Sequence, residues 1–208
     1  MRCLVFNGWA AGYETWDLCT FPHDWIFDYV EQLDGLPERV MDDIDAAVLV
    51  GFSMGGSSAL RMFLRYPEKV RGLVLVSATP RMMEDKATGW RGMGERRLAA
   101  LRLGTRMVFC DDPSPMYDER NMERGLDYLR ATDLRGDLLN AGRGRTFPVR
   151  IFQSERDGIV RPNNAEFLKR VFPHAEVTMV PGTEHVLPIT APEMIDEAVF
   201  AIMAADES

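Results

Sequence analysis

The sequence lacks any apolar run approaching the roughly 20 residues that a membrane-spanning helix needs, so we expect no membrane span. It is also poor in positive charge. Lysine and arginine number 24 against 32 acidic residues, and the net charge of −8 makes a general nucleic-acid surface a poor expectation. The composition therefore favours a protein that works on neither nucleic acid nor a membrane.

Cysteine is scarce as well. Cys3, Cys19 and Cys110 are odd in number and scattered, so they form neither a disulfide framework nor a metal-ligand cluster, which suits a reducing compartment. We expect no metal and no cofactor. The first eight residues carry one basic residue before a strand-like stretch, a poor signal peptide, so we expect a cytoplasmic protein. We also expect a monomer.

What is present is ordinary for a globular protein: 208 residues, 46% hydrophobic and 27% charged, enough for one large domain with a substantial core. Short apolar runs alternate with segments of helical spacing. This order predicts an α/β fold, with a compact six-stranded parallel sheet and helices on both faces. The predicted strands are 2–6, 25–30, 46–50, 70–76, 149–153 and 176–180, and the clearest helices are 36–44, 56–64, 164–172 and 192–205.

The alternation stops between about residues 79 and 128, where glycine and proline interrupt short helical fragments. This insertion follows the fourth predicted strand and so begins at the carboxyl ends of the strands, where such sheets bind ligands. We interpret it as a short helical lid within one domain of residues 1–208.

Residues 51–55 read Gly-Phe-Ser-Met-Gly and lie between a predicted strand and a predicted helix. That context is typical of a nucleophile elbow, in which the serine sits in strained backbone on a sharp turn. Gly51 and Gly55 have no Cβ and permit the close approach that the turn needs. The positive end of the following helix would favour negative charge near Ser53. Although the pattern alone occurs by chance, its context favours a nucleophilic serine.

A serine nucleophile needs a base to take its proton, and the chain has three histidines to choose from. His23 precedes the elbow, and no strand end presents it. His174 lies in a turn between a helix and a strand, at the amino end of the sheet. His185 follows the last predicted strand and so shares the carboxyl edge with Ser53, which makes it the candidate base, with a surface histidine as the alternative.

The acid that orients the base should follow a strand and lie between the serine and the histidine in sequence. Asp157 meets both conditions, although an Asp-Gly turn would also explain it. Glu155 is closer to the strand end, and Glu184 is adjacent to His185, so both are weaker candidates. Asp157 is therefore predicted to fix the tautomer of His185 and to stabilise its protonated form.

Two backbone N–H groups should hold the oxyanion that forms on the substrate. One belongs to Met54, which follows the nucleophile, and the other to Trp9, in the loop after the first strand. The Trp9 side chain has two interpretations that the sequence does not separate: it walls an acyl pocket, or it packs in the core.

Together these residues resemble the α/β-hydrolase superfamily, and segment 65–76 continues the elbow helix and the next strand of that fold. More narrowly, segments 7–9, 126–135 and 156–162 are similar to the carboxylesterases of biotin synthesis that cleave the methyl ester of pimeloyl-acyl carrier protein. The resemblance implies an α/β-hydrolase fold and an ester linked to a carrier protein as substrate. Where that family commonly has a histidine before Gly8, this chain has Asn7, which we expect to hydrogen-bond in its place.

The predicted lid has an unusual charge for this acidic chain. Residues 81–106 hold seven basic and three acidic residues, a net +4 in a chain of net −8. A basic lid on an acidic body suits the docking of an acidic carrier protein, for which we select Arg91, Arg102 and Arg106. The alternative is a solvated face of the lid.

The lid is also rich in methionine. Six of the chain's 13 methionines fall between residues 79 and 128, together with Trp90. Flexible thioethers suit a pocket for a linear acyl chain, although they equally fill gaps in a core. We take Trp9, Trp90 and Met93 as candidate substrate-binding residues.

The sequence therefore predicts a serine carboxylesterase with Ser53, His185 and Asp157 as its catalytic residues, and the resemblance implies pimeloyl-acyl carrier protein methyl ester as its substrate. The alternatives are an esterase or thioesterase for small molecules that needs no carrier, and a ligand-binding scaffold of the same fold without catalysis. Epoxide or haloalkane chemistry is disfavoured, because relatives with those activities have an aspartate where this chain has Ser53.

Overall fold

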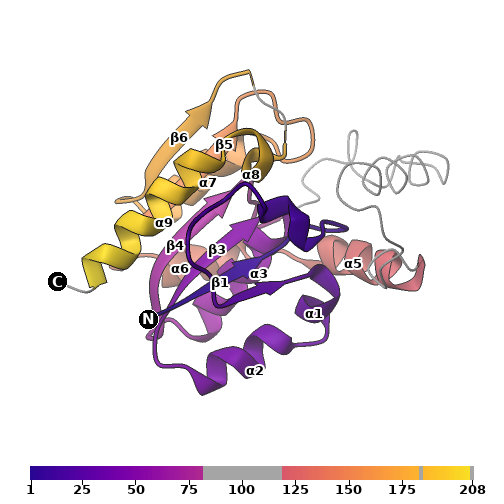
Figure 1. Cartoon of the computed structure of the whole chain (residues 1–208), viewed down its shortest axis with the longest axis horizontal. Coiled ribbons are helices and arrows are strands. Elements are labelled where there is room, and N and C mark those ends of the chain that lie inside the picture. Colours follow the sequence, from indigo (N-terminus) through magenta and orange to yellow (C-terminus); the bar gives the residue numbers. More distant parts are fainter. Residues whose placement is uncertain (82–118, 183–184, 207–208) are drawn as a thin grey trace.

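A six-stranded parallel sheet forms the centre of the computed structural model, which describes residues 1–81, 119–182 and 185–206 (Figure 1). The strand order is β2-β1-β3-β4-β5-β6. The strands are β1 (Arg2–Phe6), β2 (Trp25–Phe27), β3 (Ala47–Phe52), β4 (Val70–Val76), β5 (Val149–Ser154) and β6 (Glu176–Val180). The predicted parallel α/β architecture is confirmed.

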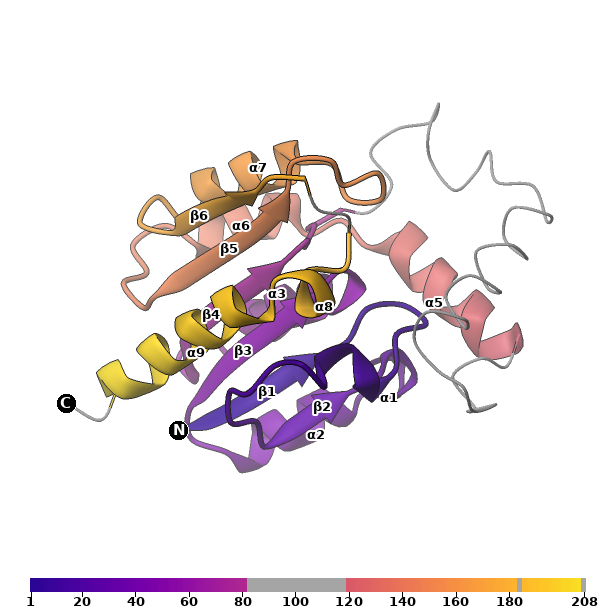
Figure 2. The same ribbon diagram turned by 45° about the horizontal axis from the view of Figure 1, so that its top comes forward.

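Helices cover both faces of this sheet (Figures 1 and 2). They are η1 (Tyr13–Trp16), α1 (Tyr29–Leu33), α2 (Leu36–Asp43), α3 (Met54–Arg65), α5 (Glu119–Ala131), α6 (Arg135–Ala141), α7 (Asn163–Val171), α8 (Leu187–Thr190) and α9 (Pro192–Asp206). Among the described residues, no helix combines the length and the apolar character that a membrane span requires.

Alternating strand residues divide the core into two layers. On one face, Leu49 and Leu73 pack in a cluster that contains Phe63 of α3. On the other face, Val50 and Val74 pack in a cluster that contains residues of α9. Strands buried on both faces explain the nearly continuous apolar runs from which the sheet was predicted.

The second strand is shorter than predicted. It ends at Phe27, because Asp28 begins α1: the Asp28 carboxylate accepts the backbone N–H of Glu31 at 2.8 Å, and the Glu31 carboxylate accepts the backbone N–H of Asp28 at 3.0 Å. This reciprocal capping box satisfies two helix-end donors. The predicted strand was therefore wrong over residues 28–30, where Asp28 caps α1 and the two apolar residues belong to that helix.

The predicted insertion overlaps α5, so its last ten residues form regular helix. α5 lies against α1, where Arg124 forms an ion pair with Asp34 and Met122 packs with Tyr29. Residues 82–118 lie outside the described residues. The lid and the single-domain organisation therefore stay predictions.

The turn from β3 into α3 brings helix backbone against the end of β1. A Cβ added at Gly55 would overlap the backbone carbonyl oxygen of Phe6, and one at Gly51 would lie 2.7 Å from the carbonyl oxygen of Gly55. Only glycine fits such backbone-to-backbone contact. The spacing of these two glycines thus fixes how closely the helix after Ser53 approaches the sheet.

We expect the substitution Gly55→Ala to destabilise the fold by about 3 kcal/mol, because a methyl group facing backbone cannot be accommodated by a side-chain rotation. Gly136→Ala is the matched control: nothing lies within 4 Å of its added Cβ, and alanine should stabilise helix α6 by up to about 1 kcal/mol. Urea unfolding measures both free energies, and equal stability of wild type and Gly55→Ala would contradict the close approach.

Candidate active site

Ser53 lies on the sharp turn between β3 and α3, in strained backbone. Its φ is 54°, one of three positive values found at non-glycine residues of the described chain. The strain persists because both sides of the turn are bonded: the Ser53 N–H donates to the carbonyl of Val76, and the Ser53 carbonyl accepts from Gly56, each at 3.0 Å. Over-determined strain of this kind concentrates at functional sites.

A chain of hydrogen bonds joins the serine to an acid through a histidine. His185 Nε2 lies 2.9 Å from Ser53 Oγ, and His185 Nδ1 lies 2.8 Å from Asp157 Oδ2. The three residues follow β3, β5 and β6, whose carboxyl ends share one edge of the sheet. The structure therefore brings together the three side chains that the sequence selected.

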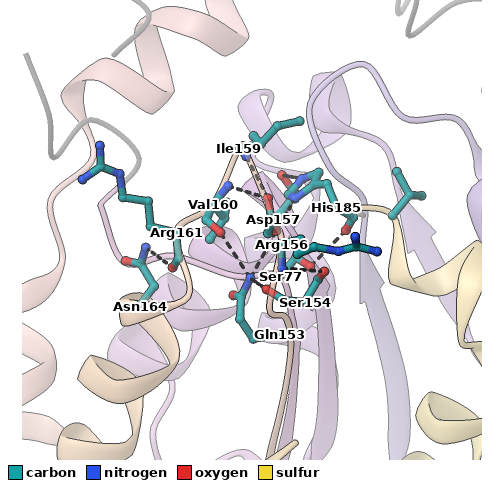
Figure 3. A network of polar contacts seen from close by, with 12 residues as sticks. Ser77, Gln153, Ser154, Arg156, Asp157, Ile159, Val160, Arg161, Asn164 and His185 are labelled. Atoms are coloured by element: carbon teal, nitrogen blue, oxygen red, sulfur yellow. Dashed lines mark hydrogen bonds and ion pairs between the residues drawn. The ribbon is translucent and has the colours of Figure 1, made fainter. Parts of the chain in front are cut away.

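The Asp157 carboxylate is fully buried and densely hydrogen-bonded (Figure 3). Its Oδ1 accepts the backbone N–H groups of Ile159 and Val160, both at 2.8 Å, and its Oδ2 accepts from Gln153 as well as facing His185. Burial alone would raise the pKa of Asp157, but the hydrogen bond and charge of His185, with the two amides, hold the pKa below its ordinary value. The group is therefore a carboxylate at neutral pH.

An ionised Asp157 fixes the tautomer of the histidine. A carboxylate only accepts hydrogen bonds, so His185 Nδ1 carries the proton and Nε2 presents its lone pair to Ser53 Oγ. The imidazole can then take the proton of the serine hydroxyl. This is the arrangement that a hydroxyl nucleophile requires.

The backbone of His185 is anchored to the residue that follows β4. Ser77, directly after β4, donates its hydroxyl to the His185 carbonyl at 3.0 Å, while its own N–H donates to the carbonyl of Phe152. The Phe52 ring packs on the imidazole with centroids 5.1 Å apart. Ser77 also has a positive φ, 44°, so a second strained residue supports the same site.

The other histidines lie elsewhere. His23 Nδ1 lies 3.3 Å from its local Phe21 carbonyl, and His174 Nε2 lies 2.8 Å from the carbonyl of Phe147, just before β5 and at the amino end of the sheet. Of the competing acids, Glu155 is exposed, and Glu184 lies outside the described residues.

The loop after β1 lies beside the serine. A Cβ at Gly8 would lie 3.1 Å from the Phe52 ring and 3.3 Å from the Ser53 Cβ, so the loop approaches the serine closely at this residue. Asn7 is fully buried and braces the loop: its Nδ2 donates to the Gly12 carbonyl at 2.8 Å, and its Oδ1 accepts the indole N–H of Trp16 at 2.7 Å. Asn7 thus makes the hydrogen bonds expected of it.

The two predicted oxyanion residues flank this contact, Trp9 in the braced loop and Met54 as the first residue of α3. The Trp9 side chain packs against α5, where its indole N–H donates to the Met122 carbonyl at 3.1 Å and a Cβ at Gly125 would lie 2.5 Å from its ring. Trp9 nevertheless remains partly exposed.

Five selected residues lie outside the described residues, namely Trp90, Arg91, Met93, Arg102 and Arg106. Within the part of the chain that the structure describes, no group of three or more histidine, cysteine or acidic residues is placed to hold a metal ion.

Two residues of the site were missed by sequence reasoning. Gln153 and Ser77 bond directly to Asp157 and His185, yet neither carries a motif. A signal was present, because each is a polar residue at the carboxyl end of an apolar strand. Polar residues at that edge of a parallel sheet point to a ligand site.

Comparison with known proteins gives the class first. A family model described as the alpha/beta hydrolase family matches residues 8–198. The chain belongs to the alpha/beta hydrolase family, and this membership supports a hydrolase activity.

Within the family, the chain is similar to two proteins named pimeloyl-[acyl-carrier protein] methyl ester esterase. That of Nitrosospira multiformis is 27% identical, with 77% of this chain and 70% of the relative covered, and that of Yersinia enterocolitica is 28% identical, with 74% and 67% covered. 

Solved structures share the fold. An alpha/beta hydrolase enzyme from a Medee basin deep-sea metagenome library superposes with a TM-score of 0.70 at 18% identity, covering 98% of this chain and 89% of its own. A bromoperoxidase from Bacillus anthracis gives 0.65 at 18%, covering 98% and 91%. Such different names on one architecture show that the fold alone does not fix the substrate.

We expect Asp157→Asn to lower stability most at neutral pH. A pKa held below its ordinary value in the folded state contributes stability above the unfolded-state pKa of about 3.9, and this contribution is lost as the pH falls through the folded-state value. The free-energy difference between wild type and variant, measured by urea unfolding at pH 7, 5 and 3, should therefore shrink below about pH 4. A constant difference would contradict a stabilised carboxylate; Asp45→Asn, at an exposed site, is the control.

Proposed function

We propose that the protein is a serine carboxylesterase that uses Ser53 as nucleophile, His185 as general base and Asp157 to orient the base. The observation that carries this proposal is the continuous hydrogen-bonded chain from Ser53 Oγ through the imidazole to the Asp157 carboxylate. It meets the geometric condition for general-base activation, heavy atoms within about 2.6–3.2 Å.

In this mechanism Ser53 Oγ attacks the ester carbonyl carbon while its proton passes to His185 Nε2. The tetrahedral intermediate collapses, the C–O bond to the alcohol breaks, and the imidazolium gives its proton to the departing alkoxide. Water then attacks the carbonyl carbon of the acyl-enzyme while its proton passes to His185 Nε2. The bond from that carbon to Ser53 Oγ breaks, the imidazolium returns the proton to the serine, and the carboxylic acid is released. Asp157 stabilises the imidazolium throughout and takes no proton.

The negative charge on the carbonyl oxygen requires donors, which we assign to the backbone N–H groups of Met54 and Trp9. Gly8 brings the loop against Ser53, and α3 begins at Met54 with the positive end of its dipole. One such donor typically contributes about 3–4 kcal/mol to lowering the barrier. Asn7 supports this site through the bonds that hold the loop.

For the substrate we propose the methyl ester of pimeloyl-acyl carrier protein. Support comes from the two relatives with that name and from the +4 charge of residues 81–106, which suits an acidic carrier. We assign carrier docking to Arg91, Arg102 and Arg106, and the acyl pocket to Trp9, Trp90 and Met93. The insertion at 79–128 acts as the lid over this pocket in a single-domain, cytoplasmic monomer.

The second candidate is an esterase or thioesterase for small molecules without a carrier. The same hydrogen-bonded chain would serve it, because nothing in the proposed chemistry of Ser53 involves the carrier. A scaffold without catalysis is disfavoured by the close contacts of His185 with both partners.

We expect Ser53→Ala to lower kcat for methyl ester hydrolysis at least roughly a thousandfold, since the nucleophile is lost. A panel of acyl methyl esters of graded length, combined with labelling by a fluorophosphonate probe, measures the effect. Ser57→Ala is the matched control. It removes a buried hydroxyl in α3, the helix that Ser53 precedes, where Ser57 donates to the Thr79 carbonyl, and it should leave labelling intact. Equal rates for wild type and Ser53→Ala would exclude the proposal.

Charge reversal at Arg91, Arg102 and Arg106 tests the carrier. If these residues dock an acidic protein, the triple Arg→Glu variant should lose at least about tenfold in kcat/KM on the carrier-linked ester and retain its rate on a free methyl ester, since surface charge acts mainly on association. Reversal of three exposed arginines outside the insertion, Arg39, Arg71 and Arg143, is the control for net charge. Equal losses on both substrates, or in both variants, would favour the small-molecule esterase.

A further inference from the structure

Gln153, in β5 one residue before its end, lies beneath the candidate acid and is 1% exposed (Figure 3). Its Nε2 donates to Asp157 Oδ2 at 3.2 Å, to the Val160 carbonyl at 3.2 Å and to the Ser154 carbonyl at 3.3 Å. All three partners are oxygens that only accept. The side-chain amide is therefore oriented with its NH₂ group, not its oxygen, toward the carboxylate.

The contacts of Asp157 show why a further donor matters. The backbone N–H groups of Ile159 and Val160 both donate to Oδ1, so neither of these two hydrogen bonds holds Oδ2. Oδ2 is the atom that faces His185 Nδ1. Gln153 fixes this second oxygen from below, in the position where it meets the imidazole.

We propose that Gln153 is a positioning residue for Asp157, whose amide holds Oδ2 in the plane that receives the His185 Nδ1–H. This inference rests on the proposed function. It assigns to the site a polar side chain that contacts neither the substrate carbonyl nor the serine.

A simpler role competes with this one, because the same amide bonds to carbonyls at both ends of the segment Ser154–Val160 and could serve only to close that loop. The two roles differ in what the amide holds. A loop-closing amide acts on the backbone alone, whereas a donor to Oδ2 fixes the oxygen that accepts the His185 Nδ1–H. Readouts that follow the Asp157–His185 bond separate them.

The first variant is Gln153→Met, which keeps the length of the side chain and removes the donor. A hydrogen bond to a charged group is stronger than one between neutral groups, so we expect kcat to fall at least about tenfold with KM unchanged. In ¹H NMR the deshielded Nδ1 proton of His185 should broaden or shift upfield, because the carboxylate is no longer held in one position. That resonance is read without substrate.

The second variant, Gln153→Glu, changes charge at nearly constant shape. An ionised glutamate would face the Asp157 carboxylate at hydrogen-bond distance, whereas a protonated one presents an O–H donor in place of the amide. The charged groups labelled with this network are Asp157 and His185 themselves, Arg156, which donates to the Gly182 carbonyl, and Arg161, whose guanidinium points away from Asp157 (Figure 3). Activity of this variant relative to wild type should therefore rise as the pH is lowered, a rescue that Gln153→Met cannot show.

Gln32→Met is the matched control for the NMR readout. Gln32 is also a buried glutamine, but its Nε2 donates to the backbone carbonyls of Asn7 and Phe27 and not to a carboxylate. This variant should lower stability as Gln153→Met does and leave the His185 Nδ1 proton unchanged.

An unshifted Nδ1 proton in folded Gln153→Met, or a Gln153→Glu variant whose relative activity does not change with pH, would overturn the positioning role. Circular dichroism establishes that each variant is folded before it is compared. Failure of the proposed function has a different signature. If the wild type hydrolyses no ester, the kinetic measurements cannot be made, but the NMR comparison of the His185 Nδ1 proton still tests the positioning role. If only Gln153→Met fails to fold, the pH dependence of Gln153→Glu decides.

Discussion

The contact between Asp157 and His185 is the interaction on which the rest of the site depends. Neither group is useful alone: a buried carboxylate needs donors to remain ionised, and a histidine needs an acceptor to present the correct nitrogen to Ser53. The fold satisfies both needs by ending β5 and β6 side by side, so that the loop after each strand supplies one partner. A parallel sheet thus brings together two loops that are separated along the chain by a helix and a strand.

Strain and support occur together at this edge of the sheet. Ser53 and Ser77 both have positive φ, both follow adjacent strands, and the backbone N–H of each donates to a neighbouring strand residue. Ser53 carries the candidate nucleophile, and Ser77 holds the backbone of His185. The ladder of β3, β4 and β5 thus stabilises two unfavourable conformations, which is how a packed core supports a costly local geometry.

The architecture and the three central side chains were predictable because they follow from simple patterns: apolar runs for buried parallel strands, and residue type at their carboxyl ends. The end of β2 at Phe27 was not predictable from hydropathy, because a buried residue such as Tyr29 suits a helix as well as a strand. The capping pair of Asp28 and Glu31 begins the helix here. Gln153 was missed because its importance lies in which oxygen it contacts, and a one-dimensional pattern does not contain orientation.

The indole of Trp9 connects the loop beside Ser53 to helix α5. It donates a hydrogen bond to the Met122 carbonyl and packs against Gly125, where there is no side chain. Displacement of α5 relative to the loop would break this contact. The free energy of a binding event that moves the helix would therefore include the cost of changing the loop. Thermodynamic reciprocity then requires the converse: whatever stabilises this conformation of the loop also stabilises α5 in its present position. The conformation of the loop and the placement of α5 are therefore coupled.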